Sequence, residues 1–165
     1  MGIQVVFIAP AMPATLLAIE SSCDETSAAV IHDGVVASLV IASQQEHSAW
    51  GGVMPELASR SHVRAIAPTV TKALRIAGAT TAELDAIAVT TQPGLIGSLL
   101  VGVNAAKGMA VALGIPLISV HHIEAHLLSV LIDTPDAEFP WISLVVSGGH
   151  TLLYVVRSAT DHQLI

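Results

Sequence analysis

The order in which short apolar segments and longer amphipathic segments follow one another constrains the fold of this chain most strongly. Three short apolar runs come first, and the pair Asp33-Gly34 between the second and third is a hairpin turn signal. Two longer segments with helical periodicity then alternate with two further short runs. The expected strands are 16–20, 27–32, 35–42, 85–90 and 117–120, and the expected helices are 55–77 and 97–113. This alternation predicts an α/β domain with a mixed sheet and flanking helices.

Proline and glycine mark the ends of the expected helices. Pro55 stands at the start of the first helix, where its missing N–H costs nothing, and Gly78 directly follows the helix. Gly114 and Pro116 end the second helix in the same way. A third helix is expected over residues 122–132.

The last part of the chain predicts a second lobe that is incomplete. Strands at 141–146 and 151–156 would form a hairpin, which is marginally stable alone. The order β-β-β-α-β-α-β before it is the lobe topology of the actin, sugar-kinase and Hsp70 ATPase superfamily, in which two such lobes enclose a nucleotide cleft. We therefore expect a disordered leader over 1–14, a first lobe with its connecting helix over 15–133, and the first hairpin of a truncated second lobe over 141–165.

Composition excludes several classes of protein. Hydrophobic residues make up 53% of the 165 residues and charged residues 12%, which is too apolar for a disordered chain and predicts a surface that needs a partner. The formal charge of −7 argues against a domain that binds nucleic acid by itself. The single cysteine, Cys23, excludes an internal disulfide, and we expect a packed thiol in a reduced, cytoplasmic protein.

No membrane attachment is expected. The apolar leader lacks a basic segment and carries Pro10 and Pro13, which is unlike a signal peptide. The apolar tract 98–120 is interrupted by Asn104 and Lys107, and this favours a buried helix followed by a buried strand over a membrane span.

A pair of histidines is the first candidate for chemistry. In the segment 121–126 (HHIEAH), His122 and His126 are four residues apart, so they share one face if the segment is helical. Two neutral imidazoles at this spacing can hold one divalent metal ion. The alternative is a pair of half-buried histidines at the start of a helix, one of them a cap.

Two turns are the other candidates. Ser147, Gly148 and Gly149 lie between two strands, where glycines let backbone N–H groups approach an anion; the alternative is an ordinary hairpin turn. Asp24, Glu25 and Thr26 come after the first strand and are expected in the turn before the second strand. A carboxylate there can orient water, a metal or an attacking amine, and the alternative is a solvated turn.

Five motifs together carry a family resemblance. They are IESSCDET (19–26), HSAWGGVMPELASR (47–60), PGLIGSLLVG (93–102), HHIEAH (121–126) and VVSGGHT (145–151). In this order they closely resemble the TsaD family, the tRNA N6-adenosine threonylcarbamoyltransferases, whose archaeal and eukaryotic relatives are the catalytic subunits of KEOPS. The resemblance covers residues 16–156.

The resemblance implies transfer of a threonylcarbamoyl group from threonylcarbamoyl-adenylate to N6 of the adenosine 3′ of the anticodon, in tRNAs that read codons beginning with A. It implies one divalent metal ion, iron or alternatively zinc, held by His122 and His126 with a third ligand from the missing part of the second lobe. It also implies substrate binding by Val145, Val146, Ser147, Gly148 and Gly149. The implied partners are tRNA, a paralogous subunit of the same fold and a small ATPase.

Two departures and two competing functions accompany the resemblance. Trp50 stands where the family has Tyr, and Gln92 where it has Gly before Pro93-Gly94. The lack of a third metal ligand predicts that this chain alone is inactive. It could instead be a truncated or degenerate family member that acts as a non-catalytic interaction module. A metallopeptidase is disfavoured, because Glu124 does not fit H-E-x-x-H or H-x-x-E-H.

Overall fold

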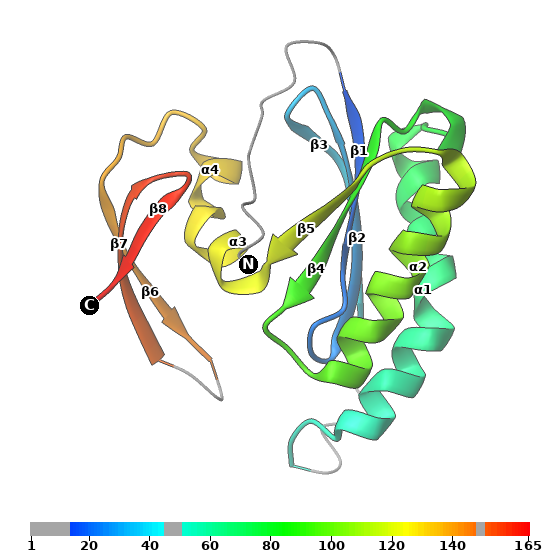
Figure 1. Ribbon diagram of the computed structural model, residues 1–165, viewed down its shortest axis with the longest axis horizontal. Coiled ribbons are helices and arrows are strands. Elements are labelled where there is room, and N and C mark those ends of the chain that lie inside the picture. The colour runs from blue at the N-terminus through cyan, green and yellow to red at the C-terminus, as the bar shows by residue number, and fades with distance from the viewer. Residues whose placement is uncertain (1–13, 45–50, 148–150) are drawn as a thin grey trace. The chain divides into compact units, whose positions relative to one another are not determined.

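The computed structural model describes residues 14–44, 51–147 and 151–165 (Figure 1). These residues divide into two compact units: the first ends at Val120 and the second begins at His121. The expected leader over 1–14 therefore lies outside the described residues, apart from Ala14.

A five-stranded mixed sheet is the centre of the first unit. Its spatial order is β3-β2-β1-β4-β5, with β1, β2 and β3 antiparallel and β4 parallel to β1. The strands are β1 (Thr15–Glu20), β2 (Glu25–His32), β3 (Val35–Ser43), β4 (Ala86–Gln92) and β5 (Leu117–His121). All five predicted strands are present, each with a boundary shifted by one or two residues. In β1, β2 and β3 buried and more exposed residues alternate, because one face of the sheet carries the core.

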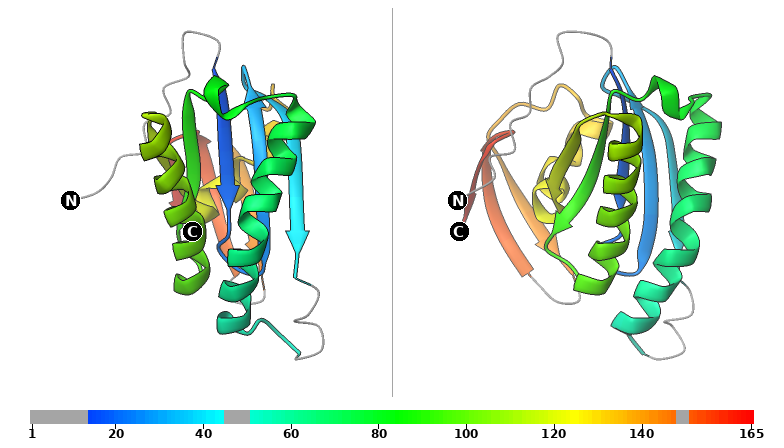
Figure 2. Two further views of the ribbon diagram at one scale, coloured as in Figure 1. Left: turned by 90° about the vertical axis from the view of Figure 1, so that its right-hand side faces the viewer. Right: turned by 45° about the vertical axis from the view of Figure 1, so that its right-hand side comes forward.

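Two helices cover the same face of this sheet (Figures 1 and 2). The first, α1 (Pro55–Ala77), packs on β2 and β3, and the second, α2 (Ile96–Leu113), packs mainly on β4. Gly78 and Gly114 end them in the left-handed conformation, with φ of 67° and 68°, as their positions in the sequence predicted. A short 3-10 helix, η2 (Thr81–Glu83), connects α1 to β4.

The core lies between the helices and the sheet. Leu17, Val30 and Ile87 of the sheet are fully or almost fully buried against small and branched residues of the helices, such as Ala73 and Ala106. Among the described residues, α2 is the one helix whose length and composition would suffice to cross a membrane. It is partly covered by the unit, since Ser98, Gly102, Ala106 and Ala110 form its buried face.

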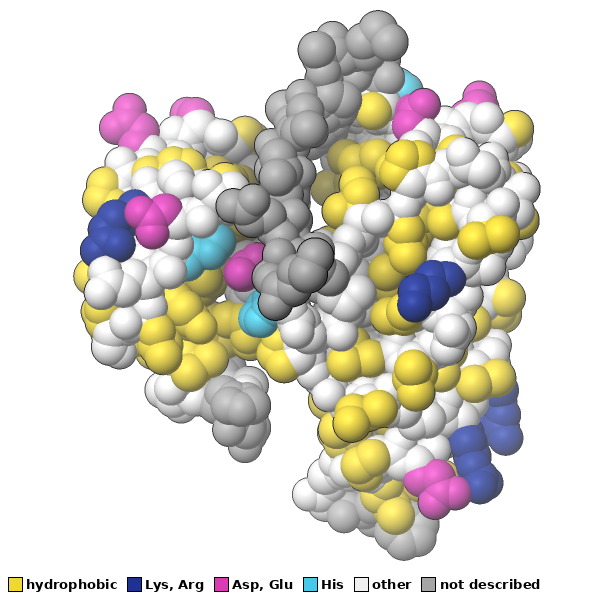
Figure 3. Space-filling view, viewed as in Figure 1, with side chains coloured by type: hydrophobic (Ala, Val, Ile, Leu, Met, Phe, Trp, Pro, Cys, Tyr) yellow, Lys and Arg dark blue, Asp and Glu magenta, His cyan; other side chains and the backbone are white. Residues whose placement is uncertain are grey.

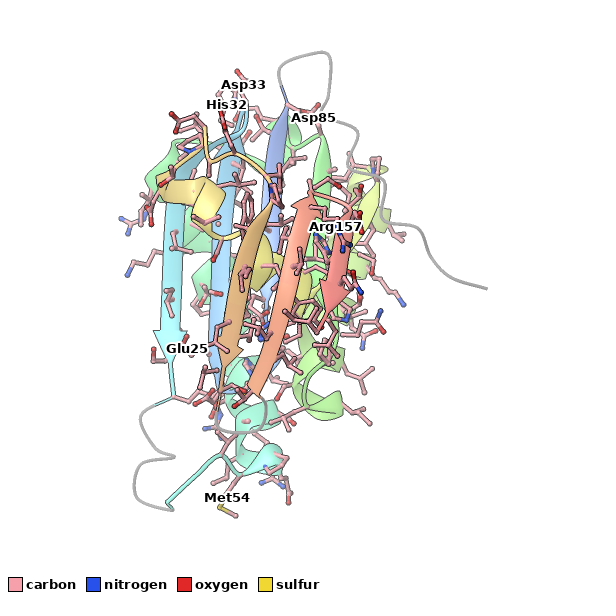
Figure 4. The ribbon with its side chains drawn as sticks, turned by 90° about the vertical axis from the view of Figure 1, so that its left-hand side faces the viewer. Glu25, His32, Asp33, Met54, Asp85 and Arg157 are labelled. Carbon is pink, nitrogen blue, oxygen red and sulfur yellow. The ribbon has the colours of Figure 1, made fainter. Side chains whose placement is uncertain are left out.

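The end of the sheet where β1 begins is closed by two carboxylates, labelled in Figure 4. The Ala14 N–H donates to Asp33 Oδ1 (2.9 Å), and the Thr15 N–H donates to Asp85 Oδ2 (2.7 Å). Asp33 has a positive φ of 52° in the tight turn between β2 and β3. These contacts fix the start of β1. The opposite end of β1 leads into the turn described below.

The second unit contains two short helices and a small antiparallel sheet of order β6-β7-β8. Its elements are α3 (His122–Leu128), α4 (Val130–Asp133), β6 (Trp141–Val146), β7 (Thr151–Ser158) and β8 (Asp161–Leu164). One prediction was wrong here: the single helix expected over 122–132 is interrupted at Ser129, whose hydroxyl donates to the His126 carbonyl (2.9 Å). The expected hairpin of 141–146 and 151–156 is confirmed. The third strand, β8, was not predicted, because its polar sequence gave no alternating pattern.

Candidate functional site

The histidine pair lies on the first turns of α3. His121 caps this helix, and its Nδ1 accepts from the Glu124 N–H (3.4 Å). One turn of helix brings Nε2 of His122 to 3.2 Å from Nε2 of His126, with the rings perpendicular and their centroids 4.5 Å apart. The two nitrogens therefore converge on one point beside the helix.

This spacing fits two ligands of one metal ion. Ring nitrogens bind zinc at about 2.0–2.1 Å, so two such nitrogens at a tetrahedral centre stand roughly 3.4 Å apart. Within the described parts of the chain, no group of three or more His, Cys, Asp or Glu side chains could hold a metal. The pair thus supplies two positions, and a stable centre needs at least one further ligand.

The predicted substrate-binding segment begins on β6. Val145 and Val146 are its last two residues, and Ser147 follows as an exposed residue. Val146 pairs with Thr151 of β7. Gly148 and Gly149 lie outside the described residues.

Trp141 joins the helix of the histidine pair to β6 inside the second unit. Its indole N–H donates to the carbonyl of Leu127, the buried residue of α3 (3.3 Å). Phe139 stacks on the same indole, with ring centroids 4.3 Å apart and an interplanar angle of 17°. One aromatic side chain thus fixes α3 relative to the strand that leads to Ser147.

Asp24 and Glu25 take different positions. Asp24 is half-buried in the turn between β1 and β2. Glu25 was expected in this turn, but it is the first residue of β2, opposite Ser43 of β3. Its carboxylate accepts from the Ser43 hydroxyl (2.7 Å), so the Glu25 side chain (labelled in Figure 4) is held at the start of β2, beside the end of β3.

The turn between β1 and β2 is held by hydrogen bonds to three consecutive carbonyl groups. The Ser22 carbonyl accepts from the Leu95 N–H (2.8 Å) and the Asp24 carbonyl from the Gln44 N–H (3.2 Å). The Cys23 carbonyl between them lies 3.0 Å from Nε2 of His62 and also accepts from the Ser98 hydroxyl (3.2 Å). All three carbonyls of the turn are thereby satisfied by neighbouring elements.

Glycines of α2 and its preceding loop permit this close approach. A Cβ at Gly94 would lie 2.6 Å from the Ser22 carbonyl oxygen, and one at Gly102 would overlap the Ser21 hydroxyl. That hydroxyl donates to the Ser98 carbonyl (2.9 Å) and accepts from the Gly102 N–H (3.2 Å). The glycines of the segment 93–102 therefore lie where this segment packs closely against other parts of the unit. Gln92, the last residue of β4, precedes the segment and is exposed.

Cys23 was expected to be a packed core thiol, and this prediction was wrong, because its side chain is exposed. Partial burial of the sulfur, its hydrogen bond to the Asp24 carboxylate and the negative charges of Asp24 and Glu20 raise the pKa of Cys23 to about 11. The thiol is therefore protonated at neutral pH and is not activated as a nucleophile.

His62, which holds this turn from α1, was not identified from the sequence. It is a fully buried histidine on α1, and its Nδ1 lies 2.7 Å from the hydroxyl of Thr26, which is also fully buried. A single histidine on a helix carries no spacing signal. Its one local clue is its place two residues after the quoted motif that ends at Arg60.

The sheet order β3-β2-β1-β4-β5, with both helices on one face, is that of a lobe of the actin, sugar-kinase and Hsp70 ATPase type. A solved structure, YeaZ from Pseudomonas aeruginosa, has the same fold: its TM-score is 0.63 at 19% identity, over 92% of this chain and 64% of that one. Residues 34–165 match the family model TsaD, tRNA N6-adenosine threonylcarbamoyltransferase, and the chain belongs to this family.

Curated relatives carry the same family name. The tRNA N6-adenosine threonylcarbamoyltransferase of Magnetococcus marinus is 54% identical over 162 residues, and that of Trichlorobacter lovleyi 57% identical over 152 residues. Each alignment covers 91% of this chain but 46% and 44% of the relative. The chain thus spans about half the length of the curated relatives it matches.

Proposed function

We propose that this chain is the N-terminal part of a transferase that moves a threonylcarbamoyl group from threonylcarbamoyl-adenylate to N6 of the adenosine 3′ of the anticodon, in tRNAs that read codons beginning with A. The observation that carries the proposal is the 3.2 Å approach of two ring nitrogens, from His122 and His126, in a chain of this family. In the reaction, N6 forms a bond to the carbamoyl carbon, the bond from that carbon to the phosphate oxygen breaks, AMP leaves and N6 loses a proton.

His122 and His126 would hold one divalent ion, iron or alternatively zinc, together with a ligand from outside this chain. A metal of this kind polarises a carbonyl or orients phosphate oxygens. Backbone groups at the end of β6 would contact the substrate, namely those of Val145, Val146 and Ser147. We extend this proposal to Gly148 and Gly149.

Asp24 is the better placed of the two proposed catalytic carboxylates. It stands in a turn whose three carbonyls are fixed, so the direction of its side chain is constrained before substrate binds. Glu25 is held by Ser43, which supports a structural role at the edge of the site. We propose that Asp24 orients the substrate or accepts the proton that N6 loses.

Exposed apolar residues on the helices support the proposal of a protein partner. In α2, Ile96 (78% exposed), Leu100 and Val111 (84% exposed) lie on the side away from the sheet, and Val63 and Ile76 of α1 are also exposed. Figure 3 shows hydrophobic side chains spread over this unit with few charged ones between them. A surface of this kind is suited to a subunit of the same fold. The small ATPase and tRNA would then bind the complex of subunits in the cytoplasm. A chain with a charge of −7 is poorly suited to bind tRNA phosphates by itself, so a complex fits this charge better.

A chimera tests the activity. The second half of the Magnetococcus marinus relative is fused after Ile165, loaded with iron or zinc, and mixed with threonylcarbamoyl-adenylate, partner proteins and a suitable tRNA. We expect threonylcarbamoyladenosine in the digested tRNA by mass spectrometry. The variant with His122→Ala and His126→Ala should lose both bound metal and product.

Two outcomes would change the proposal. A folded, metal-loaded chimera without product would favour the alternative function, a non-catalytic module that binds the complex, and Gln92→Gly would then be the first reversion to make. Unchanged metal content in the double histidine variant would overturn the assignment of the two ligands.

A further inference from the structure

The fully buried His62 has an arrangement that a packing role alone does not require. It projects from α1 into the first unit, and both of its ring nitrogens have partners. Nε2 faces the Cys23 carbonyl at 3.0 Å, and a carbonyl can only accept, so Nε2 carries the proton. In the neutral ring Nδ1 is then the acceptor of the Thr26 hydroxyl at 2.7 Å.

The order of these groups forms a relay from a strand to the candidate site. The Thr26 hydroxyl in β2 donates to Nδ1 of His62 and holds its ring, and Nε2 of His62 donates to the Cys23 carbonyl in the turn. The hydroxyl of Ser98, at the start of α2, is the second donor to that carbonyl (3.2 Å). The carbonyl at the middle of the turn is therefore fixed by both helices.

We infer that His62, with its ring held in place by the Thr26 hydroxyl, is a positioning residue that holds the Cys23 carbonyl and thereby aims the Asp24 carboxylate. The inference rests on the proposed function for its catalytic consequence, while the held geometry of the turn can be tested without any activity. His62 itself is fully buried, so it touches no substrate and acts through Asp24.

Cys23, the one cysteine of the chain, reports on this geometry. Its pKa of about 11 depends on its partial burial and on the nearby Asp24 carboxylate. A turn released from His62 lets the thiol move into water and away from Asp24, and the pKa then falls toward its ordinary value of 9.0.

The test compares Thr26→Val, which keeps the shape of the side chain but removes the hydroxyl, with Thr26→Ser, which keeps the hydroxyl. The rate of iodoacetamide alkylation is measured against pH in the 165-residue chain. We expect Thr26→Val and His62→Gln to react roughly tenfold faster than wild type at about pH 8, for a pKa lower by about one unit, and Thr26→Ser to react like wild type.

A control separates positioning from loss of stability. Ser38→Ala removes another buried hydrogen bond to α1, from the Ser38 hydroxyl to the Ala73 carbonyl (2.8 Å), and should leave the alkylation profile unchanged. Folded Thr26→Val and His62→Gln proteins with the wild-type profile would overturn the inference. If His62→Gln does not fold, Thr26→Val and Ser98→Ala decide the question, because each removes one hydroxyl from the relay.

The effect of these residues on catalysis is measured in the chimera. Thr26→Val should lower kcat about tenfold with little change in KM, and should lower it no further when Asp24→Asn is already present, because both changes act on one group. Additive losses would overturn the positioning role while the transferase proposal stands. An inactive wild-type chimera would count against the transferase proposal alone, and the alkylation profiles would still decide whether His62 holds the turn.

Discussion

The turn at Ser21–Asp24 and the helix α3 carry candidate site residues, and they are held in different ways. The turn is fixed by buried hydroxyls, by His62 and by backbone groups from three other segments. The helix α3 has only seven residues, and His126 on it is exposed. A prominent contact of His122 and His126 is the one between their two rings. The comparison teaches that the first region is preformed by contacts within its own unit, whereas the second would take its final geometry with the metal ion that we propose.

The largest effect is expected where a side chain would enter the preformed turn. In Gly94→Ala the new Cβ meets backbone atoms, the Ser22 oxygen at 2.6 Å and its Cα at 3.0 Å, which cannot move aside as a flexible side chain could. We expect the free energy of unfolding to fall by about 3 kcal/mol, from overpacking and the weakened hydrogen bond to Leu95. Urea denaturation followed by circular dichroism measures it.

Gly108→Ala is the matched control in α2. A Cβ at Gly108 meets no atom within 4 Å, so the change should raise stability by about 0.5–1 kcal/mol through helix propensity. If Gly94→Ala were as stable as Gly108→Ala, the turn would not be closely packed and the comparison would fail.

The second prediction concerns the metal. Replacing His122 and His126 with Ala should change the stability of the metal-free chain by less than about 0.5 kcal/mol, since His126 is exposed. The same change should weaken zinc binding at least about tenfold, because two converging nitrogens are lost. Competition with a chromophoric chelator measures the affinity.

His32→Ala serves as the control for this experiment. His32 lies in the other unit, where its Nδ1 is 2.8 Å from the Thr15 hydroxyl. Equal zinc affinity in the double variant and in His32→Ala would mean that the histidine pair is not the metal site.

A smaller effect is expected from Trp141→Phe, which keeps an aromatic ring but removes the hydrogen bond to the Leu127 carbonyl. We expect a loss of about 1 kcal/mol. Hydrogen exchange should show faster exchange in α3 and β6 and unchanged protection in β1 and β2. Equal loosening of both units would contradict the distinction between a preformed and an adaptable region.

The smallest effect is expected at an exposed carboxylate that belongs to neither region. The hydroxyl and N–H of Thr80 donate to the Glu83 carboxylate (2.7 Å each) and lower the pKa of Glu83 below its ordinary value of 4.5. A lowered pKa means that the stabilisation is present above pH 4.5 and is lost as the pH falls through the lowered pKa. The difference in Tm between wild type and Glu83→Gln should therefore close on acidification. A difference that stays constant from about pH 7 to about pH 3 would show that the charge contributes nothing.

Local signals in the sequence predicted local structure well. Helix α1 begins at Pro55 and ends at Ala77, as the proline and Gly78 indicated, because both residues act through their own backbone angles. The sequence also predicted that His122 and His126 share a helix face. The interruption at Ser129 was missed, since it depends on a side-chain hydrogen bond that competes with the helix.

Features that depend on distant residues could not be predicted. The burial of His62 results from its packing against Thr26 and Cys23, which lie 36 and 39 positions away in the chain. The exposure of Cys23 was missed for the same reason, since an apolar strand precedes it and only the fold shows that the turn ends at the surface. Glu25 was assigned to the turn because a polar side chain is not typical of a strand, and its partner, the Ser43 hydroxyl of β3, is 18 positions away in the chain.

The mixed pairing of β1 also has a consequence for the order of folding. On one side β1 pairs with β2 through a tight connection, with Glu20 opposite Ser27, and on the other it pairs with β4, with Leu16 beside Ala86. Pairing β1 with β4 closes a much longer segment of chain than pairing β1 with β2, and this costs more chain entropy. The β1–β2–β3 meander should therefore form first and the parallel pairing with β4 later. The Cys23 carbonyl receives its donors only after α1 and α2 have docked, and the candidate site at the turn is therefore among the last parts of the unit to be completed.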